Sequence, residues 1–144
     1  MESFVTKNTD ETRQKGREFA SGLKGGEVVC LYGDLGAGKT VFVSGVIDFF
    51  LPGKRVLSPT FIIVRHYSTN KEKIKELIHV DLYRLDHENE IERVGLGQYM
   101  HRSDSVVLIE WAEKLKTHLP SARTDIKISH TNQHTRTFEI VNYE

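Results

Sequence analysis

The chain has 144 residues, a length that fits one domain with a buried core. Lysine and arginine together number 20, and aspartate and glutamate also number 20, so the formal net charge is zero. A protein that holds nucleic acid or an anionic membrane through its overall charge usually carries a basic excess. The balance therefore argues against both partners and leaves room only for a local basic patch.

The cysteine and the apolar runs indicate a cytoplasmic protein. Cys30 is the one cysteine and lies in the apolar stretch VVCLY, where a small core residue is expected. It can form no internal disulfide, which suits a reducing compartment. No apolar run approaches the length that spans a membrane, and the N-terminal MESFVTKNTDETRQ lacks the pattern of a secretory signal.

The first half of the chain predicts a helix, a buried strand and a second helix. Apolar residues at helical spacing indicate a helix over residues 8–23, which Asn8 or Thr9 can cap and which the GG pair ends. The run EVVCLY at 27–32 is continuous and apolar, as in strands buried on both faces. After a glycine-rich loop, helical spacing returns over residues 43–50.

The second half predicts two hairpins around one more buried strand. TFIIVRHY (60–67) and KELIHVDLYRL (75–85) are strand-like and joined by the turn-rich STNKEK, so the sheet should be mixed. A modest helix over 88–100, the strand SVVLIE (105–110) and a short helix over WAEKLKTHL follow. TDIKISHT and RTFEIV form a terminal hairpin. Strands alternating with helices predict a three-layer α/β sandwich with a small, mainly parallel sheet and a C-terminal β-hairpin.

The stretch LYGDLGAGKT matches the phosphate-loop (Walker A) pattern between Gly33 and Thr40, at the expected place between a strand and a helix. Glycines let backbone N–H groups surround phosphates, and the following helix N-terminus adds partial positive charge. Lys39 would put a compact cation on the outer phosphates, and the Thr40 hydroxyl could bind Mg²⁺. The sandwich is thus expected to be P-loop NTPase-like. The predicted nucleotide-binding residues of the loop are Gly33, Asp34, Leu35, Gly36, Ala37, Gly38, Lys39 and Thr40.

Two carboxylates that end apolar strands are candidates for a further magnesium ligand. Glu110 ends VVLIE, and Asp81 ends LIHVD. Strand alternation places Asp81 on the same face as His79 and Tyr83, so we expect it to point out of the core toward a polar group. We predict that Glu110 binds the metal and that Asp81 supports catalysis or orients water. An ordinary strand-end carboxylate is the alternative for each.

Two further residues have a functional and a structural interpretation. Thr60, in SPTF, could sense the terminal phosphate as switch threonines do, or it could be a plain turn residue. Trp111 follows Glu110 directly. Core packing is the favoured interpretation for Trp111, and a wall beside the metal carboxylate is the alternative.

Taken together, GDLGAGKT, SPTF, HVDLYRL and IEW resemble the motifs of the TsaE family, in family order and over nearly the whole chain. The resemblance implies a single P-loop ATPase domain over residues 1–144 that uses ATP and Mg²⁺. Such proteins are needed in bacteria to make threonylcarbamoyladenosine in tRNA. The implied partners are TsaD, which performs the transfer, and its scaffold TsaB; the tRNA is met only through that complex, which ATP hydrolysis resets between turnovers.

The resemblance also implies roles for individual residues. Thr40 and Glu110 are expected to hold Mg²⁺, and Thr9 and Arg136 to approach the ATP from the two ends of the chain. The implied catalytic residues are Asp81, Glu110, Lys39 and Thr60. The chain departs from the family pattern at Val41, Ala112 and Thr135, where threonine, proline and glycine are usual. Thr135 puts the contact of Arg136 with ATP in question.

Three other functions are weighed against the ATPase. A small P-loop kinase acting on a small molecule would need a lid with several arginines and a substrate-binding insertion, for which the chain has little room. A GTP-binding switch would need an Asn-Lys-x-Asp stretch, which is absent from the sequence. A nucleotide-binding module without hydrolysis stays open. For hydrolysis, Asp81 could position water and Arg84 or Arg136 could stabilise charge, so we expect a slow ATPase that partner proteins complete or regulate.

Overall fold

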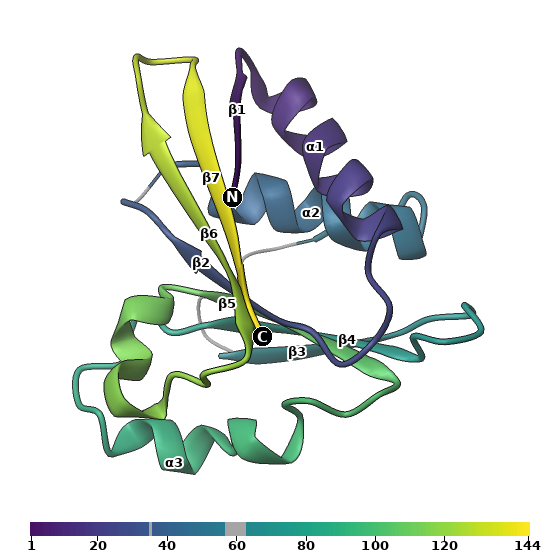
Figure 1. Cartoon of the computed structure of the whole chain (residues 1–144), viewed down its shortest axis with the longest axis vertical. Coiled ribbons are helices and arrows are strands. Elements are labelled where there is room, and N and C mark those ends of the chain that lie inside the picture. Colours follow the sequence, from purple (N-terminus) through teal and green to yellow (C-terminus); the bar gives the residue numbers. More distant parts are fainter. Residues whose placement is uncertain (35, 57–62) are drawn as a thin grey trace.

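The structure is a computed structural model that describes residues 1–34, 36–56 and 63–144 (Figure 1). These ranges contain a mixed sheet of seven strands in the order β1-β7-β6-β2-β5-β4-β3. The elements in chain order are β1 (Glu2–Thr6), α1 (Thr9–Ser21), β2 (Val28–Tyr32), α2 (Lys39–Phe50), β3 (Val64–Ser68), β4 (Glu76–Asp81), α3 (Glu90–Val94), the 3-10 helix η1 (Leu96–Gln98), β5 (Ser105–Glu110), the 3-10 helix η2 (Ala112–His118), β6 (Arg123–His130) and β7 (Arg136–Tyr143).

The sheet has a parallel centre and antiparallel edges. Strands β6, β2, β5 and β4 pair in parallel, and the β3–β4 and β6–β7 pairs are the two predicted hairpins. The mixed sheet and the C-terminal hairpin are therefore confirmed. Strand β1 was not predicted; its partner is β7, more than a hundred positions along the chain, with Phe4 opposite Phe138 and the two rings stacked 4.7 Å apart.

Helices cover both faces of the sheet, so the three-layer α/β fold is confirmed. Figure 1 shows α1 and α2 on one side and α3 on the other. One core cluster joins the sheet to α1 and α2, and it contains Ala20, Phe42 and Ile47. A second cluster joins the opposite face to α3, η1 and η2, and it contains Ile91 and Leu115. No helix in the described residues is both long and apolar enough to cross a membrane.

One of the predicted elements differs from the structure, and one predicted core residue is confirmed. The single helix expected over 88–100 is wrong: α3 ends at Val94, because Gly95 has a left-handed backbone (φ 74°) that closes the helix before η1 begins. Cys30 is confirmed as a core residue, with none of its surface exposed. Burial raises the pKa of the Cys30 thiol to about 12, with the Asp125 carboxylate adding to the shift, so the thiol stays protonated.

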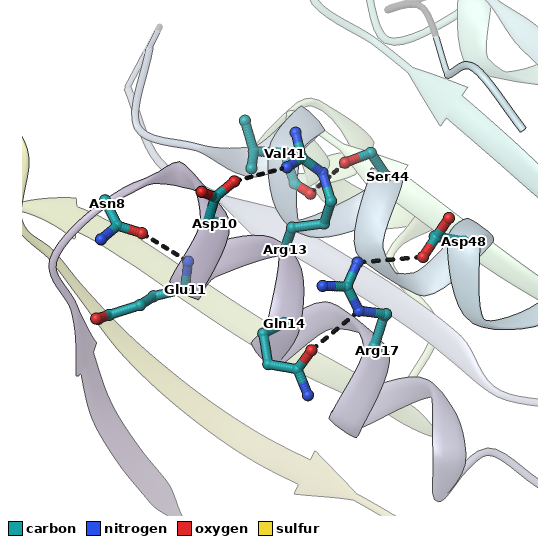
Figure 2. A network of polar contacts seen from close by, with 9 residues as sticks. All are labelled: Asn8, Asp10, Glu11, Arg13, Gln14, Arg17, Val41, Ser44 and Asp48. Carbon is teal, nitrogen blue, oxygen red and sulfur yellow. Dashed lines mark hydrogen bonds and ion pairs between the residues drawn. The ribbon is translucent and has the colours of Figure 1, made fainter. Parts of the chain in front are cut away.

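Helix α1 is capped and held against α2 by polar contacts (Figure 2). The Asn8 side chain accepts a hydrogen bond from the Glu11 backbone N–H at 2.8 Å, so Asn8, rather than Thr9, is the cap. The Glu11 carboxylate in turn accepts one from the Lys7 N–H at 2.8 Å. Arg17 of α1 forms an ion pair with Asp48 of α2 at 3.1 Å, which ties the two helices together (Figure 2).

The two helices cross with their backbones in direct contact. A Cβ atom placed on Gly45 of α2 would collide with the backbone oxygen of Arg13, and one on Gly16 of α1 would collide with that of Phe42. Glycine at both positions lets the helices approach to this distance. This contact sets the position of α1 over the first turns of α2.

We expect Gly45→Ala to lower the free energy of unfolding by about 1–3 kcal/mol, because the added methyl group must push α1 away from α2. The melting temperature should fall by about 2–4 °C for each kcal/mol in a chain of this size. Gly97→Ala is the matched control, since a Cβ there meets nothing within 4 Å. Equal melting temperatures for the two variants in thermal unfolding would contradict the close-contact explanation.

Candidate nucleotide site

The candidate residues gather at one edge of the sheet. The glycine-rich loop follows β2, Glu110 ends β5 and Asp81 ends β4. These three strands are parallel neighbours, so their carboxyl ends lie together, and Asp81 is directly opposite Glu110 in the register. The carboxyl edge of a parallel sheet is where α/β proteins usually bind ligands.

The loop curls over the sheet and leads directly into α2. Gly33 has φ 151°, and a Cβ there would lie 2.5 Å from the backbone oxygen of Ile128. Gly38 is the N-cap of α2 and has φ 108°. The first turn of a helix has N–H groups that no helical carbonyl accepts, and these suit an anion. Ala37 is buried behind the loop. The predicted Leu35 lies outside the described residues.

Lys39 opens α2 and is almost completely buried, with 4% of its surface exposed. Its ammonium donates to the carbonyl oxygens of Gly33 and Asp34, the second at 3.1 Å. It also lies 4.0 Å from the centroid of the Trp111 ring. Burial lowers the pKa of Lys39, and the carboxylates of Glu110, Glu113, Asp81 and Asp34 partly oppose this effect. Within the described residues Lys39 forms no ion pair, so its acceptors are neutral carbonyls.

Glu110 sits between a threonine and a histidine. The Thr40 hydroxyl donates to Glu110 Oε1 at 2.8 Å, and His79 Nε2 lies 2.5 Å from Glu110 Oε2. Glu110 is 2% exposed and His79 is completely buried. The structure thus brings together Thr40 and Glu110, which were predicted to hold Mg²⁺. His79 was not among the predicted site residues; its signal in the sequence is an ionisable residue between two apolar neighbours of a predicted strand.

Asp81 is nearer the interior than predicted, with 8% of its surface exposed. Its Oδ1 accepts a hydrogen bond from the Tyr83 backbone N–H at 2.9 Å. The carboxylate lies close enough to Lys39 to favour that residue's charged form. Asp81 therefore belongs to the same polar group as Glu110 and Lys39.

Trp111 both packs against the core and borders the candidate site beside Lys39. It packs against the core cluster beneath α3, and its ring covers the Lys39 ammonium. The Tyr83 ring lies 5.1 Å from it, centroid to centroid. Trp111 has a left-handed backbone (φ 60°), which turns the chain sharply after Glu110.

Of the two residues expected to approach the ATP from the chain ends, Arg136 contacts the loop and Thr9 forms no hydrogen bond with it among the described residues. Arg136 reaches the loop despite the preceding Thr135: its Nη2 donates to Gly36 O at 3.3 Å, while Nη1 donates to carbonyls of the β6–β7 turn. Thr9 is exposed at the start of α1. The buried residue of that helix near the loop is Thr12, whose Cγ2 lies 3.9 Å from a Cβ built on Gly38. Thr60 lies outside the described residues.

The donors in this site fit a magnesium–nucleotide complex. No group of three or more histidine, cysteine, aspartate or glutamate side chains that could hold a metal occurs in the described ranges. The protein ligands on offer are the oxygens of Thr40 and Glu110, 2.8 Å apart. Mg²⁺ prefers oxygen ligands and usually takes one or two from protein, with phosphates and waters supplying the others.

The fold and the strand–loop–helix arrangement define a three-layer α/β protein with a glycine-rich loop between a central strand and the helix that follows it. The family model described as "Threonylcarbamoyl adenosine biosynthesis protein TsaE" matches residues 6–138. The chain belongs to the TsaE family.

Individual relatives agree with this assignment. The Bacillus subtilis protein named "tRNA threonylcarbamoyladenosine biosynthesis protein TsaE" is 39% identical over 123 residues, which cover 85% of this chain and 74% of the relative. The Rickettsia bellii protein of the same name is 34% identical over 139 residues, covering 96% and 93%. The crystal structure of Bacillus subtilis YdiB superposes with a TM-score of 0.80 at 28% identity, covering 99% of this chain and 86% of that one.

Proposed function

We propose that this protein binds and hydrolyses ATP with Mg²⁺ as a subunit of the machinery that makes threonylcarbamoyladenosine in tRNA. The role in this biosynthesis is supported by the names of the relatives. The ATP site is supported chiefly by one observation: a buried lysine without an ion pair, within the described residues, stands at a helix N-terminus beside the Thr40–Glu110 pair. Phosphate oxygens are stronger acceptors than the carbonyls that Lys39 now contacts.

Each residue has a part in this proposal. The loop N–H groups and Lys39 hold the phosphates, and Arg136 approaches from the C-terminal hairpin. Thr40 and Glu110 would hold Mg²⁺, which neutralises charge on the outer phosphates when bound. Asp81, beside Glu110, orients the attacking water. Trp111 shields Lys39 from solvent and so strengthens its attraction for phosphate.

We further propose that the protein docks on a TsaD–TsaB complex and that hydrolysis resets this complex between turnovers. The zero net charge fits a subunit that leaves tRNA binding to its partners. The Arg136 guanidinium, which donates to Gly36 of the loop, is engaged with several carbonyl oxygens, so we propose that the stabilisation of transition-state charge is completed on docking. The protein alone should therefore be a slow ATPase.

The first test is a pull-down in which the tagged chain captures purified TsaD–TsaB in the presence of a non-hydrolysable ATP analogue, of ADP, or of no nucleotide. The second test measures the ATPase rate of the chain with and without these partners. We expect capture to depend on the nucleotide, and turnover alone to stay well below about 10 s⁻¹, a typical enzyme rate, and to rise when the partners are added. A small-molecule kinase would ignore these partners. Rapid turnover by the isolated chain, or no capture in any nucleotide state, would refute the docking proposal.

A further inference from the structure

His79 is a buried ionisable residue to which the proposed function assigns no role. It lies on the central strand β4, two positions before Asp81, and none of its surface is exposed. Its Nε2 is 2.5 Å from Glu110 Oε2, while its Nδ1 is buried and has no hydrogen-bond partner among the described residues. Among the described residues, the contact with Glu110 Oε2 is therefore the one hydrogen bond that the His79 side chain forms.

The direction of that hydrogen bond follows from the chemistry of its partners. An ionised carboxylate can only accept, so Nε2 carries the proton and donates it. Hydrogen bonds to ionised groups are shorter and stronger than neutral ones, and a dry environment strengthens them further. Oε2 of Glu110 is thereby occupied, and the carboxylate cannot turn about its last bond without losing this contact.

The other oxygen of the same carboxylate faces Thr40. Oε1 accepts from the Thr40 hydroxyl at 2.8 Å, so the two oxygens of Glu110 point to opposite neighbours. Only Oε1 lies on the side where a metal held by Thr40 would sit. A metal at this position can take one oxygen from Glu110, and a chelate through both oxygens is blocked as long as His79 holds Oε2.

We propose that His79 is a positioning residue that restricts Glu110 to one metal-facing oxygen and so makes the site prefer Mg²⁺ to Ca²⁺. The proposal rests on the Mg²⁺–nucleotide site proposed above. Mg²⁺ demands near-octahedral geometry and takes carboxylates through single oxygens, whereas Ca²⁺ accepts more ligands and often binds both oxygens of one carboxylate. Hydrogen-bond partners of metal ligands typically change metal affinity by about 10- to 100-fold when mutated.

Two substitutions separate the hydrogen bond from the bulk of the side chain. His79→Gln keeps an N–H donor at roughly the reach of Nε2, and His79→Leu fills much of the space without a donor. The exposed His87→Leu is the control for loss of a histidine away from the site. Calorimetry would give the dissociation constant of a non-hydrolysable ATP analogue with Mg²⁺, with Ca²⁺ and with EDTA, and thermal unfolding would report on the fold.

For the wild-type chain we expect tighter binding with Mg²⁺ than with Ca²⁺. His79→Leu should weaken the Mg²⁺-dependent binding by about tenfold and bring the two constants together, while His79→Gln restores most of the preference. A ratio that is unchanged in a folded His79→Leu variant, or a wild-type chain without preference for Mg²⁺, overturns the proposal. If His79→Leu does not fold, His79→Asn replaces it, since the shorter asparagine amide cannot reach Glu110 Oε2. An unchanged ratio of the Mg²⁺ and Ca²⁺ dissociation constants in His79→Asn would also overturn the proposal.

One result bears on the nucleotide site itself. If the wild-type chain binds the analogue equally well with Mg²⁺ and with EDTA, the proposed metal site is wrong, and the role of His79 falls with it. If Mg²⁺ strengthens binding in the wild type and the histidine variants match it, only the role of His79 is wrong.

Discussion

Lys39→Met should weaken ATP binding by about 100-fold, which corresponds to about 2.7 kcal/mol. The ammonium is the buried cation beside the loop, and a charge-assisted hydrogen bond to phosphate in a shielded site is worth more than one in water. Methionine keeps most of the apolar stem and its packing against Trp111. Equilibrium titration of a fluorescent ATP analogue measures the change.

The same substitution should leave the fold intact. Burial lowers the pKa of Lys39, so its charged form is less favourable in the folded chain than in the unfolded chain. Removing the charge therefore removes the free-energy cost of burying it in the folded state. The loss of the hydrogen bonds to the carbonyls of Gly33 and Asp34 offsets this gain in stability. We expect a melting temperature close to that of the wild type.

Lys73→Met is the matched control for Lys39→Met, because Lys73 is an exposed lysine in the turn before β4, and the site lies at the opposite end of that strand. It should bind ATP like the wild type. If Lys39→Met also binds like the wild type, phosphate recognition does not depend on this lysine, and the assignment of the loop fails.

Glu110→Gln should reduce Mg²⁺-dependent ATP hydrolysis by about 100-fold. Glutamine has nearly the same shape but no charge. Its carbonyl oxygen can accept the hydrogen bond from His79 only if its NH₂ group faces Thr40, where the metal ligand is needed. The metal would thus lose both an anion and an oxygen. Steady-state hydrolysis over a range of Mg²⁺ concentrations measures the effect, with thermal unfolding as the check on the fold.

Two further variants, one at an exposed glutamate and one at Asp81, are needed to interpret the result for Glu110→Gln. Glu72→Gln, an exposed glutamate in the turn between β3 and β4, should hydrolyse ATP at the wild-type rate. Asp81→Asn should also slow hydrolysis, but with an unchanged dependence on Mg²⁺ concentration, because Asp81 is assigned to water and not to the metal. Full activity in Glu110→Gln, with a shifted Mg²⁺ dependence in Asp81→Asn, would transfer the metal role to Asp81.

The sequence by itself determined the features that depend on neighbouring residues. The spacing of Gly33, Gly38, Lys39 and Thr40, between a buried strand and a helix, predicts a phosphate loop, and the structure has the strand and the helix in these places. Continuous apolar runs marked the central strands β2 and β5, and alternation marked the C-terminal hairpin. Such patterns are local because side-chain periodicity and backbone conformation are set within a few residues.

The tertiary structure alone decided which distant residues meet. Strand β1 has too few apolar residues to be predicted from its own sequence. It forms because the edge of β7 offers backbone groups with which it can pair. Asp81 and Glu110 had similar sequence signals. Only the side-chain geometry gives Glu110 the contacts with Thr40 and His79, which are 70 and 31 positions away along the chain. Strand order and register fix such encounters, and both are properties of the whole sheet.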